Sequence, residues 1–519
     1  MLLRAGRFGS FGLPLFRIIR PFTVMSSVMS EPVPAKREIS PPPRPPKKKV
    51  KVKKYKEPPV DPVSSEGVLI NDIKSLLQSK GISEQNVIND MQEFFSRPKG
   101  EPHPEHGPVT VKIEGQSSVG DGIGLYEVSP DRYRVITVPF ALAGETVEAK
   151  VFKTFKYYFQ ADLIKVVTPS PVRNNDLIKC KYFGQCSGCQ YQMIPYENQL
   201  EMKRQVIVNA FKHYATGIDR SRLPEVLPTM ASPLTHGYRT KLTPHFDVPR
   251  QGLQAPPPIG FGIKGQKKVL DIEECPIGTS IVNKGMTEQR KHVHDNYASY
   301  KRGATLLLRE NALTPEERVC TTSTKEIITE YIDQFKFQYP AGSFFQNNNS
   351  ILPLVTAYVR DNIVLPSTGK LPKYLVDTYC GSGLFAVTCS TASESVIGVE
   401  ISKDSVAYAQ KNADMNGVKN ASFIVGEAEK IFEKVNTNPE DTSIIIDPPR
   451  KGCDKAFLDQ LLDFSPAKVV YVSCNVHSQA RDIEYILSDP RNKYKVESIR
   501  GFDFFPQTHH VESVAVLST

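Results

Sequence analysis

The sequence predicts an α/β protein with a doubly wound domain at its C-terminus, preceded by an antiparallel β-barrel and a β-rich central lobe. From Leu371 onward, apolar strand segments alternate with helical segments, which is typical of a doubly wound sheet. From Val109, short runs of alternating apolar and polar residues are separated by Gly, Pro and Asp turns, as in a small barrel. A length of 519 residues, 40% of them hydrophobic, provides enough apolar side chains for two or three such domains.

The positive charge of the chain is concentrated at its N-terminus. The first 60 residues hold 14 Lys and Arg against three acidic residues, a net charge of +11, whereas the whole chain has +9. The remaining 459 residues therefore sum to −2, which excludes a basic coat over the whole protein and limits any polyanion site to a local patch. No stretch approaches the roughly 20 apolar residues of a membrane-spanning helix, so we expect no contact with a membrane.

Residues 1–60 are predicted to be a disordered targeting segment. The first 30 residues space four arginines among Leu, Phe and Ile and contain no acid, which is the composition of a mitochondrial presequence. A basic tail without a targeting role is the alternative. A proline-rich run and a lysine block follow at 41–56, as in nuclear-import signals. With Met25 and Met29 as alternative starts, we expect a mitochondrial product from Met1 and a nuclear or cytosolic product from an internal start.

Two smaller regions follow the targeting segment. Apolar residues at helical spacing, interrupted at Lys80-Gly81, predict a helical hairpin of unknown role at 61–104. Residues 105–170 predict a five-stranded barrel of the oligonucleotide-binding type. One of its hairpins carries basic and aromatic side chains that suit RNA binding, namely Lys150, Lys153, Lys156, Tyr157 and Tyr158. A solvated turn is the alternative explanation for these residues.

The predicted central domain, residues 171–340, begins with clustered cysteines. Cys180, Cys186 and Cys189 lie on one glycine-containing loop, and three thiolates so close in sequence suit a metal site. Cys275, which precedes a proline, is the natural fourth ligand. Without a second CxxC pair or an HxxxH pair, a [4Fe–4S] cluster is favoured over zinc. Zinc, or thiols without a metal, are the alternatives.

The C-terminal domain, residues 341–519, carries polar motifs at the carboxyl ends of its predicted strands, where doubly wound sheets bind ligands. The first strand ends in D-T-Y-C-G-S-G (Asp377–Gly383), the second at Glu400 and the third at Glu427. The glycine turn lacks the GxGxxG pattern of dinucleotide-binding domains. A glycine turn followed about 20 residues later by an acid favours S-adenosylmethionine instead, because the carboxylate can accept both ribose hydroxyls.

Two further strand ends carry candidate reactive groups. The fourth strand ends in D-P-P-R-K-G (Asp447–Gly452), where Arg450 replaces the aromatic residue that amino-group methyltransferases use to stack a base. The nucleophile is therefore expected elsewhere, and Cys474 at the end of the fifth strand is the obvious candidate, although a lone cysteine is usually an inert buried thiol. Glu512, at the head of the final strand, can be the base, although such a glutamate is usually an ordinary surface residue.

Together these motifs resemble those of the S-adenosylmethionine-dependent RNA uracil-C5 methyltransferases, and they are close to the tRNA type that makes ribothymidine in the T-loop. The motifs are P-A-G-S-F-F-Q-N (Pro340–Asn347), Asp377–Gly383, Asp447–Gly452, V-S-C-N (Val472–Asn475) and F-P-Q-T-H-H-V-E (Phe505–Glu512). The barrel around V-P-F-A-L-A-G-E (Val138–Glu145) resembles the TRAM domain of that family. The cysteine spacing resembles the [4Fe–4S] ligand set of its bacterial rRNA branch.

The resemblance implies a role for each candidate residue. It implies a thiolate nucleophile at Cys474 and a base at Glu512. Five residues are implied as cofactor contacts: Gln346, Tyr379, Glu400, Glu427 and Asp447. The chemistry agrees, because uracil C5 attacks a methyl group only after a thiolate adds to C6, and a base must then remove the C5 proton.

We therefore expect an S-adenosylmethionine-dependent tRNA (uracil-C5)-methyltransferase whose partner is the T-arm of tRNA. An enzyme acting on rRNA and a non-catalytic tRNA-binding or tRNA-folding protein are the alternatives. An additional nuclease activity is a weaker alternative, since no unassigned pair of carboxylates suggests a catalytic metal. Protein partners cannot be inferred from the sequence.

Overall fold

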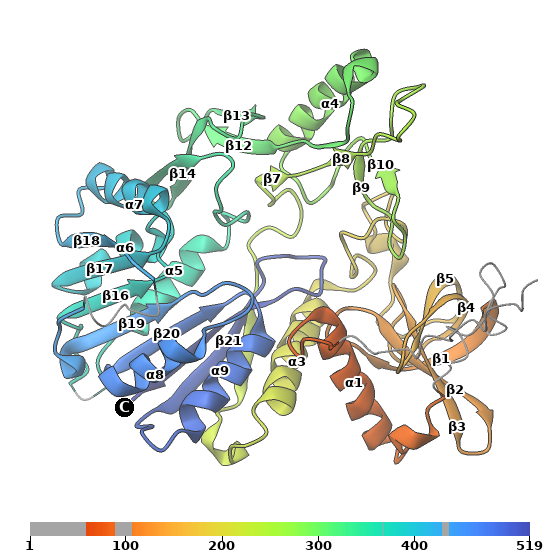
Figure 1. Cartoon of the computed structure of the whole chain (residues 1–519), viewed down its shortest axis with the longest axis horizontal. Coiled ribbons are helices and arrows are strands. Elements are labelled where there is room, and N and C mark those ends of the chain that lie inside the picture. The colour runs from red at the N-terminus through yellow and green to blue at the C-terminus, as the bar shows by residue number, and fades with distance from the viewer. Residues whose placement is uncertain (1–58, 89–105, 367, 428–434) are drawn as a thin grey trace, which may run out of the picture. The chain divides into compact units, whose positions relative to one another are not determined.

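The computed structural model describes residues 59–88, 106–366, 368–427 and 435–519 (Figure 1). The predicted targeting segment up to residue 58 and residues 89–104 of the predicted helical hairpin lie outside these ranges. In chain order, the described part contains a helix, a closed barrel, several small sheets and one large mixed sheet. No helix within it is long and apolar enough to cross a membrane.

Helix α1 (Ser65–Ser79) precedes the barrel. Its N-cap, Ser64, has an extended backbone, and its side chain accepts a hydrogen bond from the N–H of Gly67. Gly67 fits this tight start because a Cβ there would lie 2.4 Å from the carbonyl oxygen of Asp61. The helix ends next to Gly81, at the interruption predicted from the sequence, and Gly81 has a φ of +69°.

The barrel confirms the predicted TRAM-like region. Its closed order is β1-β2-β3-β5-β4, and the strands are β1 (Pro108–Gln116), β2 (Gly122–Ser129), β3 (Arg132–Val138), β4 (Thr146–Thr154) and β5 (Phe159–Thr168). Alternation is clearest in β4, where the side chains of Val147, Ala149 and Val151 are buried in the barrel while Lys150 is exposed. One pair differs from the antiparallel expectation, because β3 and β5 run parallel where the chain closes the barrel.

The central region contains two helices and ten short strands. The helices are α3 (Tyr196–Tyr214) and α4 (Ser280–Asp295). The strands are β6 (Val226–Met230), β7 (Lys241–Leu242), β8 (His245–Phe246), β9 (Gly260–Gly262), β10 (Val269–Asp271), β11 (Ala304–Thr305), β12 (Leu308–Ala312), β13 (Arg318–Thr321), β14 (Ile327–Ile332) and β15 (Phe335–Pro340). Most of them pair in sheets of two to four strands, as expected for a β-rich lobe.

The C-terminal sheet has eight strands in the order β18-β17-β16-β19-β20-β22-β21-β6. Its C-terminal strands are β16 (Tyr374–Thr378), β17 (Ser395–Glu400), β18 (Ala421–Val425), β19 (Thr442–Ile446), β20 (Lys468–Ser473), β21 (Lys495–Phe502) and β22 (Glu512–Ser518). The strands from β16 to β20 are parallel, and β22 is antiparallel to both of its neighbours. This is the predicted doubly wound arrangement of parallel strands, with the antiparallel strand β22 added at one side.

Part of the predicted central domain belongs to this sheet. Strand β6 pairs with β21 in parallel, with Val226 opposite Ile499, although it lies well before the predicted start of the C-terminal domain at residue 341. Helix α3 packs with the C-terminal helix α9 (Val476–Ser488) over the same sheet face. A strand of five residues gives no local signal of the sheet it will join, so the sequence did not reveal this extension.

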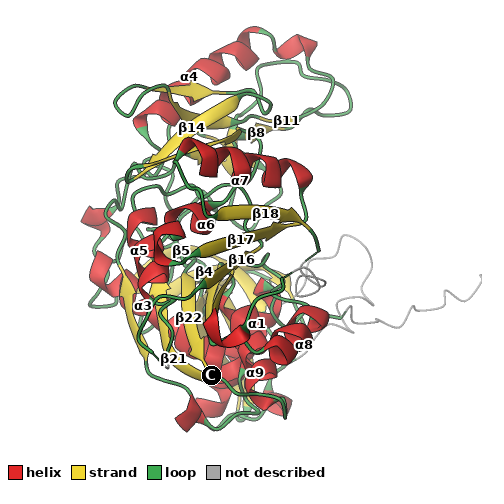
Figure 2. Cartoon of the chain, turned by 90° about the vertical axis from the view of Figure 1, so that its left-hand side faces the viewer, coloured by secondary structure: helices red, strands yellow, loops and turns green. Residues whose placement is uncertain are grey.

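Helices cover both faces of the large sheet (Figure 2). One apolar layer joins the sheet to α3, α8 (Lys455–Phe464) and α9, and the other joins it to α5 (Leu352–Asp361), α6 (Leu384–Thr388) and α7 (Lys403–Met415). Strands β19 and β20, in the middle, are buried along their whole length. Because five parallel strands end at one edge, the polar residues that follow them are brought to the same side of the molecule.

Candidate active site

The glycine turn after β16 forms a tight strand-to-helix connection. Tyr379, the first residue after β16, has a φ of +61°, and Gly381 and Gly383 also have positive φ values. A Cβ on Gly383 would lie 3.2 Å from the Cβ of Ala409 in α7. The turn therefore depends on glycine, and its backbone stays close to the carboxyl end of the sheet.

Glu400 lies directly beside this turn. Its side chain accepts hydrogen bonds from the N–H of Gly381 at 3.3 Å and of Ser402 at 2.8 Å. These contacts hold the half-buried carboxylate between the ends of β16 and β17, as expected for a group that binds a ribose.

Asp377 supports the turn from beneath. One carboxylate oxygen accepts a hydrogen bond from the N–H of Ala386 at 2.8 Å, whereas the other has no partner among the described residues. Burial raises the pKa of Asp377 well above its ordinary value. The sequence analysis included Asp377 in a motif but assigned it no role. Its position at the end of an apolar strand could have indicated a buried carboxyl group that supports the turn.

Cys474 and Glu512 meet at the ends of β20 and β22. The two strands pair antiparallel up to Ser473 opposite Ser513, so Cys474 and Glu512 are the next residues along the ladder. The carboxylate of Glu512 adds to the rise in the pKa of Cys474, which shows that the two side chains lie near each other. The structure therefore brings together two candidates that are far apart in the sequence.

Asp447, which follows β19, also affects the pKa values of Cys474 and Glu512. Burial, reinforced by Asp447, raises the pKa of Glu512 to about 8. Burial raises the pKa of Asp447 to about 7. Burial also raises the pKa of Cys474 to about 12, the two carboxylates add to the rise, and Arg450 opposes it. Three predicted residues and Arg450 thus form one electrostatically connected group.

The Cys474 side chain opens into a cavity of about 400 Å³. Arg450, Lys451 and His477 also line it. The side-chain amide of Asn475 donates to the carbonyl oxygen of Arg450 at 2.9 Å, which ties the loops after β19 and β20 together. Cys474 is half-buried and lines this cavity, whereas Cys389 is buried and does not line it.

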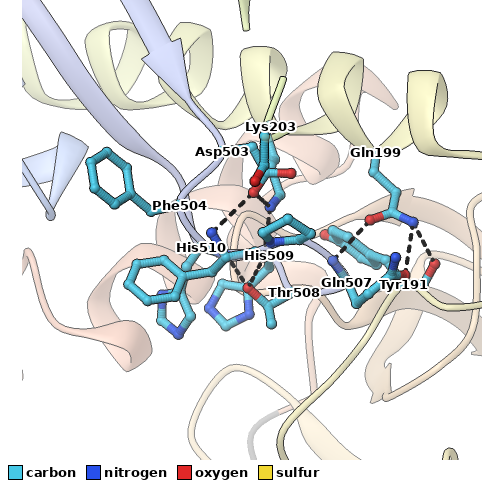
Figure 3. Close-up of polar contacts among 12 residues, drawn as sticks. Tyr191, Gln199, Lys203, Asp503, Phe504, Gln507, Thr508, His509 and His510 are labelled. Atoms are coloured by element: carbon cyan, nitrogen blue, oxygen red, sulfur yellow. Dashed lines mark hydrogen bonds and ion pairs between the residues drawn. The ribbon is translucent and has the colours of Figure 1, made fainter. Parts of the chain in front are cut away.

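The loop that leads into Glu512 is anchored by α3 (Figure 3). Lys203 forms an ion pair with Asp503 and donates to the carbonyl oxygen of Phe505 at 2.9 Å. Gln199 accepts from the backbone N–H of Gln507 at 3.1 Å and donates to its side-chain oxygen at 3.1 Å. These contacts fix the loop at Asp503, Phe505 and Gln507 against one helix.

The residues just after Cys189 also hold the loop that leads into Glu512. The backbone N–H groups of Gln190 and Tyr191 both donate to the carbonyl oxygen of Gln507, at 2.9 and 3.0 Å. The buried Gln507 has a φ of +72°, a conformation that needs such external support in a non-glycine residue. Residues from α3 and from the segment just after Cys189 therefore hold the loop that leads into Glu512, and no motif in the sequence indicated them.

The remaining cofactor candidates are Tyr379, Glu427 and Gln346. Tyr379 is half-buried, and its ring is 5.7 Å from that of Phe457. Glu427 is exposed just after β18, and Gln346 is half-buried in the loop between β15 and α5. Their contacts with a cofactor stay predictions.

The four predicted metal ligands are neighbours but do not form a metal site in the described structure. Cys180 and Cys186 raise the pKa of both Cys189 and Cys275, and Cys275 raises that of Cys189. The N–H of Gly188 donates to the sulfur of Cys186 at 3.4 Å, a type of contact that suits a thiolate. Nevertheless, within the described ranges no three His, Cys, Asp or Glu side chains are placed to hold a metal ion. Four thiols are suitable ligands for a metal, but in this structure they are not arranged around one site.

Comparisons with known proteins identify relatives of this chain. The family model of tRNA (uracil-5-)-methyltransferases matches residues 324–519, and that of the TRAM domain matches residues 108–164. The chain is 45% identical to a tRNA (uracil(54)-C(5))-methyltransferase of Saccharomyces cerevisiae, covering 91% of this chain and 83% of the relative. It is 47% identical to the protein so named in Schizosaccharomyces pombe, covering 90% and 85%.

A solved structure has a similar fold. The tRNA (uracil-54, C5)-methyltransferase of Pyrococcus abyssi, in complex with S-adenosyl-L-homocysteine, aligns with 79% of this chain and all of its own, with a TM-score of 0.59 and 23% identity. The two fungal relatives match over most of their length as well as most of this chain. The chain therefore belongs to the tRNA (uracil-5-)-methyltransferase family.

Proposed function

We propose that this protein transfers a methyl group from S-adenosylmethionine to C5 of uridine 54 in the T-loop of tRNA. The observation that carries the proposal is the opposition of Cys474 and Glu512 at the end of the β20–β22 ladder, with Asp447 beside them. A thiol and a neighbouring carboxyl group of raised pKa are the two groups that uracil-C5 methylation requires. The names of the two fungal relatives support position 54 of tRNA as the target.

The carboxyl edge of the sheet suits S-adenosylmethionine. Glu400 beside the Gly381 turn offers a carboxylate to the ribose, and the unpartnered oxygen of Asp377 lies beneath the same turn. We assign further cofactor contacts to Gln346, Tyr379, Glu427 and Asp447. When bound there, S-adenosylmethionine supplies a methyl group that is electrophilic because it is attached to a sulfonium.

Cys474 begins the reaction on a uridine that has left its stack. A base inside an RNA loop cannot admit a thiol on one side and a methyl donor on the other, so the nucleotide must be flipped into the cavity. Cys474 loses its proton to solvent, and its sulfur forms a bond to C6. The electron pair of the C5–C6 double bond moves toward O4, which makes C5 a nucleophile that takes the methyl group.

Glu512 completes the reaction. The methylated adduct carries a proton on C5, and the carboxylate of Glu512 removes it. The C5–C6 double bond forms again as the bond between C6 and sulfur breaks, which releases Cys474 as a thiolate. A pKa of about 8 places Glu512 near neutral pH, where a general base works efficiently.

The test is methyl transfer from tritiated S-adenosylmethionine to unmodified tRNA, followed by nucleoside analysis. We expect ribothymidine at position 54 from the wild type and from Cys320→Ala, which changes a half-buried thiol in β13, and no product from Cys474→Ala. Product on rRNA fragments but not on tRNA would move the activity to rRNA. Binding of tRNA without methylation of either RNA would contradict the enzymatic function.

A cluster at the four cysteines is a separate part of the proposal. The spacing and thiol chemistry of Cys180, Cys186, Cys189 and Cys275 support a [4Fe–4S] cluster that stabilises the loop against the central region. No step of the chemistry uses it. Anaerobically purified protein should contain about four irons per chain and absorb broadly in the visible range. Protein with neither iron nor this absorption would contradict the cluster.

Dual location is the third part of the proposal. The arginine-spaced first 30 residues support import into mitochondria, and the lysine block at 41–56 supports a nuclear or cytosolic form started at Met25 or Met29. Fluorescent fusions that begin at Met1 and at Met29 should differ in location. Identical distributions of the two fusions would contradict it.

A further inference from the structure

The first turn of α1 forms a wall of the cavity that contains Cys474. Ser64 and Ser65 line this cavity together with Cys474, Arg450 and Lys451. The helix lies before the residues matched by the TRAM and methyltransferase models, which begin at 108 and 324. A segment outside both matched domains therefore contributes directly to the surroundings of the candidate nucleophile.

The position of α1 is fixed by contacts with the catalytic domain. The hydroxyl of Tyr214 in α3 donates to the carbonyl oxygen of Pro62 at 2.5 Å and accepts from the side chain of Asn71 at 2.9 Å. Asn475, the residue after Cys474, donates to the carbonyl oxygen of Val63 at 3.4 Å. The side chains of Val63 and Val68 are buried in the apolar layer that contains α3 and α9. The first turn is thus built into the site.

The other side of α1 is fixed to the barrel. The carboxylate of Asp72 accepts hydrogen bonds from the N–H and hydroxyl of Ser118, at 2.7 and 3.1 Å. Leu69, Ile73 and Leu77 pack in one apolar cluster with barrel residues. Figure 1 shows α1 between α3 and the barrel. The helix therefore connects the predicted RNA-binding domain to the catalytic cavity.

The lining of the cavity favours an anion. Arg450 and Lys451 bring two positive charges, and the start of a 15-residue helix adds the partial positive charge of its first N–H groups. Asp61 brings one carboxylate, which accepts a hydrogen bond from the N–H of Val63 at 3.1 Å. His477 lines the same cavity, is only 8% exposed, and its Nδ1 has no hydrogen-bond partner in the described part of the chain. This ring nitrogen is thus a second polar group beside the cavity that the described protein leaves without a partner.

We propose that the first turn of α1, with Arg450 and Lys451, binds a phosphodiester of the RNA loop next to the flipped uridine. The inference rests on the proposed function, because it assigns the anion to the RNA that enters the Cys474 cavity. Phosphate contacts fix the register of a nucleic acid without reading its sequence, so this contact would position the target base over the thiol.

Ser65→Glu is the direct test, because its effects on folding and on RNA binding have opposite signs. Ser65 is exposed at the first position of the helix, where an acidic side chain stabilises the helix through its dipole. The same carboxylate would repel a phosphate in the cavity. We expect an unchanged or higher Tm, a rise of about tenfold in the Kd and KM for tRNA, and a KM for S-adenosylmethionine within about twofold of the wild type.

Two further variants complete the experiment. Ser79→Glu places the same charge in the last turn of the same helix, outside the cavity, and should leave the tRNA Kd within about twofold. Ser65→Arg should bind tRNA at least as tightly as the wild type, and the affinity lost in Ser65→Glu should shrink at high salt.

The outcomes separate this inference from the proposed function. If the wild type methylates tRNA and Ser65→Glu has wild-type tRNA affinity, the phosphate contact is wrong and the function stands. If Ser65→Glu raises only the KM for S-adenosylmethionine, the anion is the carboxylate of the cofactor and the inference is likewise overturned. Methylation by the wild type reports on the proposed function alone, and the tRNA Kd is measured without turnover.

Discussion

Lys203 in α3 and Asp503 at the start of the loop leading to Glu512 form an ion pair in which both side chains are 0% exposed. The two residues are 300 positions apart, so the pair joins a helix of the central region to the catalytic loop. A buried pair of this kind contributes little over apolar residues when both partners are present, but removing one partner leaves a charge without compensation. The pair therefore makes the position of the loop sensitive to α3.

Lys203→Met should destabilise the protein strongly because it leaves the Asp503 carboxylate buried without its cation. We expect a loss of about 3–5 kcal/mol in the free energy of unfolding, measured by urea denaturation. Lys455→Met is the matched control, because Lys455 forms a solvent-exposed pair with Asp459 in α8, and it should change the free energy of unfolding far less than Lys203→Met. Equal losses in the two variants would show that the buried pair has no special role.

The rate of methyl transfer should rise with pH between about 6 and 8. The carboxylate of Glu512 must be ionised to accept the C5 proton, and its raised pKa of about 8 keeps it mostly protonated at pH 6. Ionisation of Cys474, with its still higher pKa of about 12, changes the rate in the same direction. Single-turnover rates should increase at least about tenfold across this interval. A rate that is flat or falling from pH 6 to 8 would contradict the assignment of Glu512 as the base.

Glu512→Gln should stabilise the folded protein, most of all at high pH. Folding raises the pKa of Glu512 from an ordinary value of 4.5 to about 8, so the native state binds more protons than the unfolded state between these values. The stability of the wild type therefore falls as pH rises from about 4.5 to 8, and the amide removes this loss. We expect a gain of about 1–3 kcal/mol at pH 8 and a smaller gain at pH 5, measured by urea denaturation.

The control for this variant is Glu225→Gln, which changes a side chain that is 87% exposed. It should alter the free energy of unfolding by less than about 0.5 kcal/mol at either pH. If Glu512→Gln is no more stable than the wild type at pH 8, burial does not oppose ionisation of Glu512.

Gly383→Ala should weaken cofactor binding more than it destabilises the fold. Its Cβ would meet α7 at 3.2 Å in a backbone with a φ of +89°, so the glycine turn must move. We expect the KM for S-adenosylmethionine to rise about tenfold, as when one good polar contact is lost. Gly417→Ala has a similar φ of +69° but nothing within 4 Å of the new Cβ. It should cost about 1 kcal/mol of stability and leave this KM unchanged, and a similar KM change in both would show that backbone strain alone is responsible.

The sequence was most informative where local patterns determine structure. The alternation of Val147, Ala149 and Val151 predicts a barrel strand, and the glycine turn at Gly381 and Gly383 predicts the close strand-to-helix connection that the structure shows. The candidate residues at strand ends could be expected to share one edge because parallel strands end together.

Long-range packing could not be predicted in this way. Lys203 and Gln199 lie in a polar helix whose sequence does not show that it will hold a loop about 300 residues away. The insertion of β6 beside β21 and the wall formed by Ser65 depend on contacts between separate regions. The cysteine spacing identifies a donor set, but whether four thiols converge depends on the distances between two loops, which spacing does not determine.

The most direct test of the central claim is a search for a covalent bond between Cys474 and RNA. Glu512→Gln is incubated with S-adenosylmethionine and unmodified tRNA, and the products are separated on a denaturing gel. Because the C5 proton cannot be removed, we expect a protein–RNA adduct that carries the transferred methyl group, and no adduct from the Cys474→Ala/Glu512→Gln double variant. An adduct that persists in the double variant, or no adduct in Glu512→Gln while the wild type makes ribothymidine, would contradict the assigned roles of these two residues.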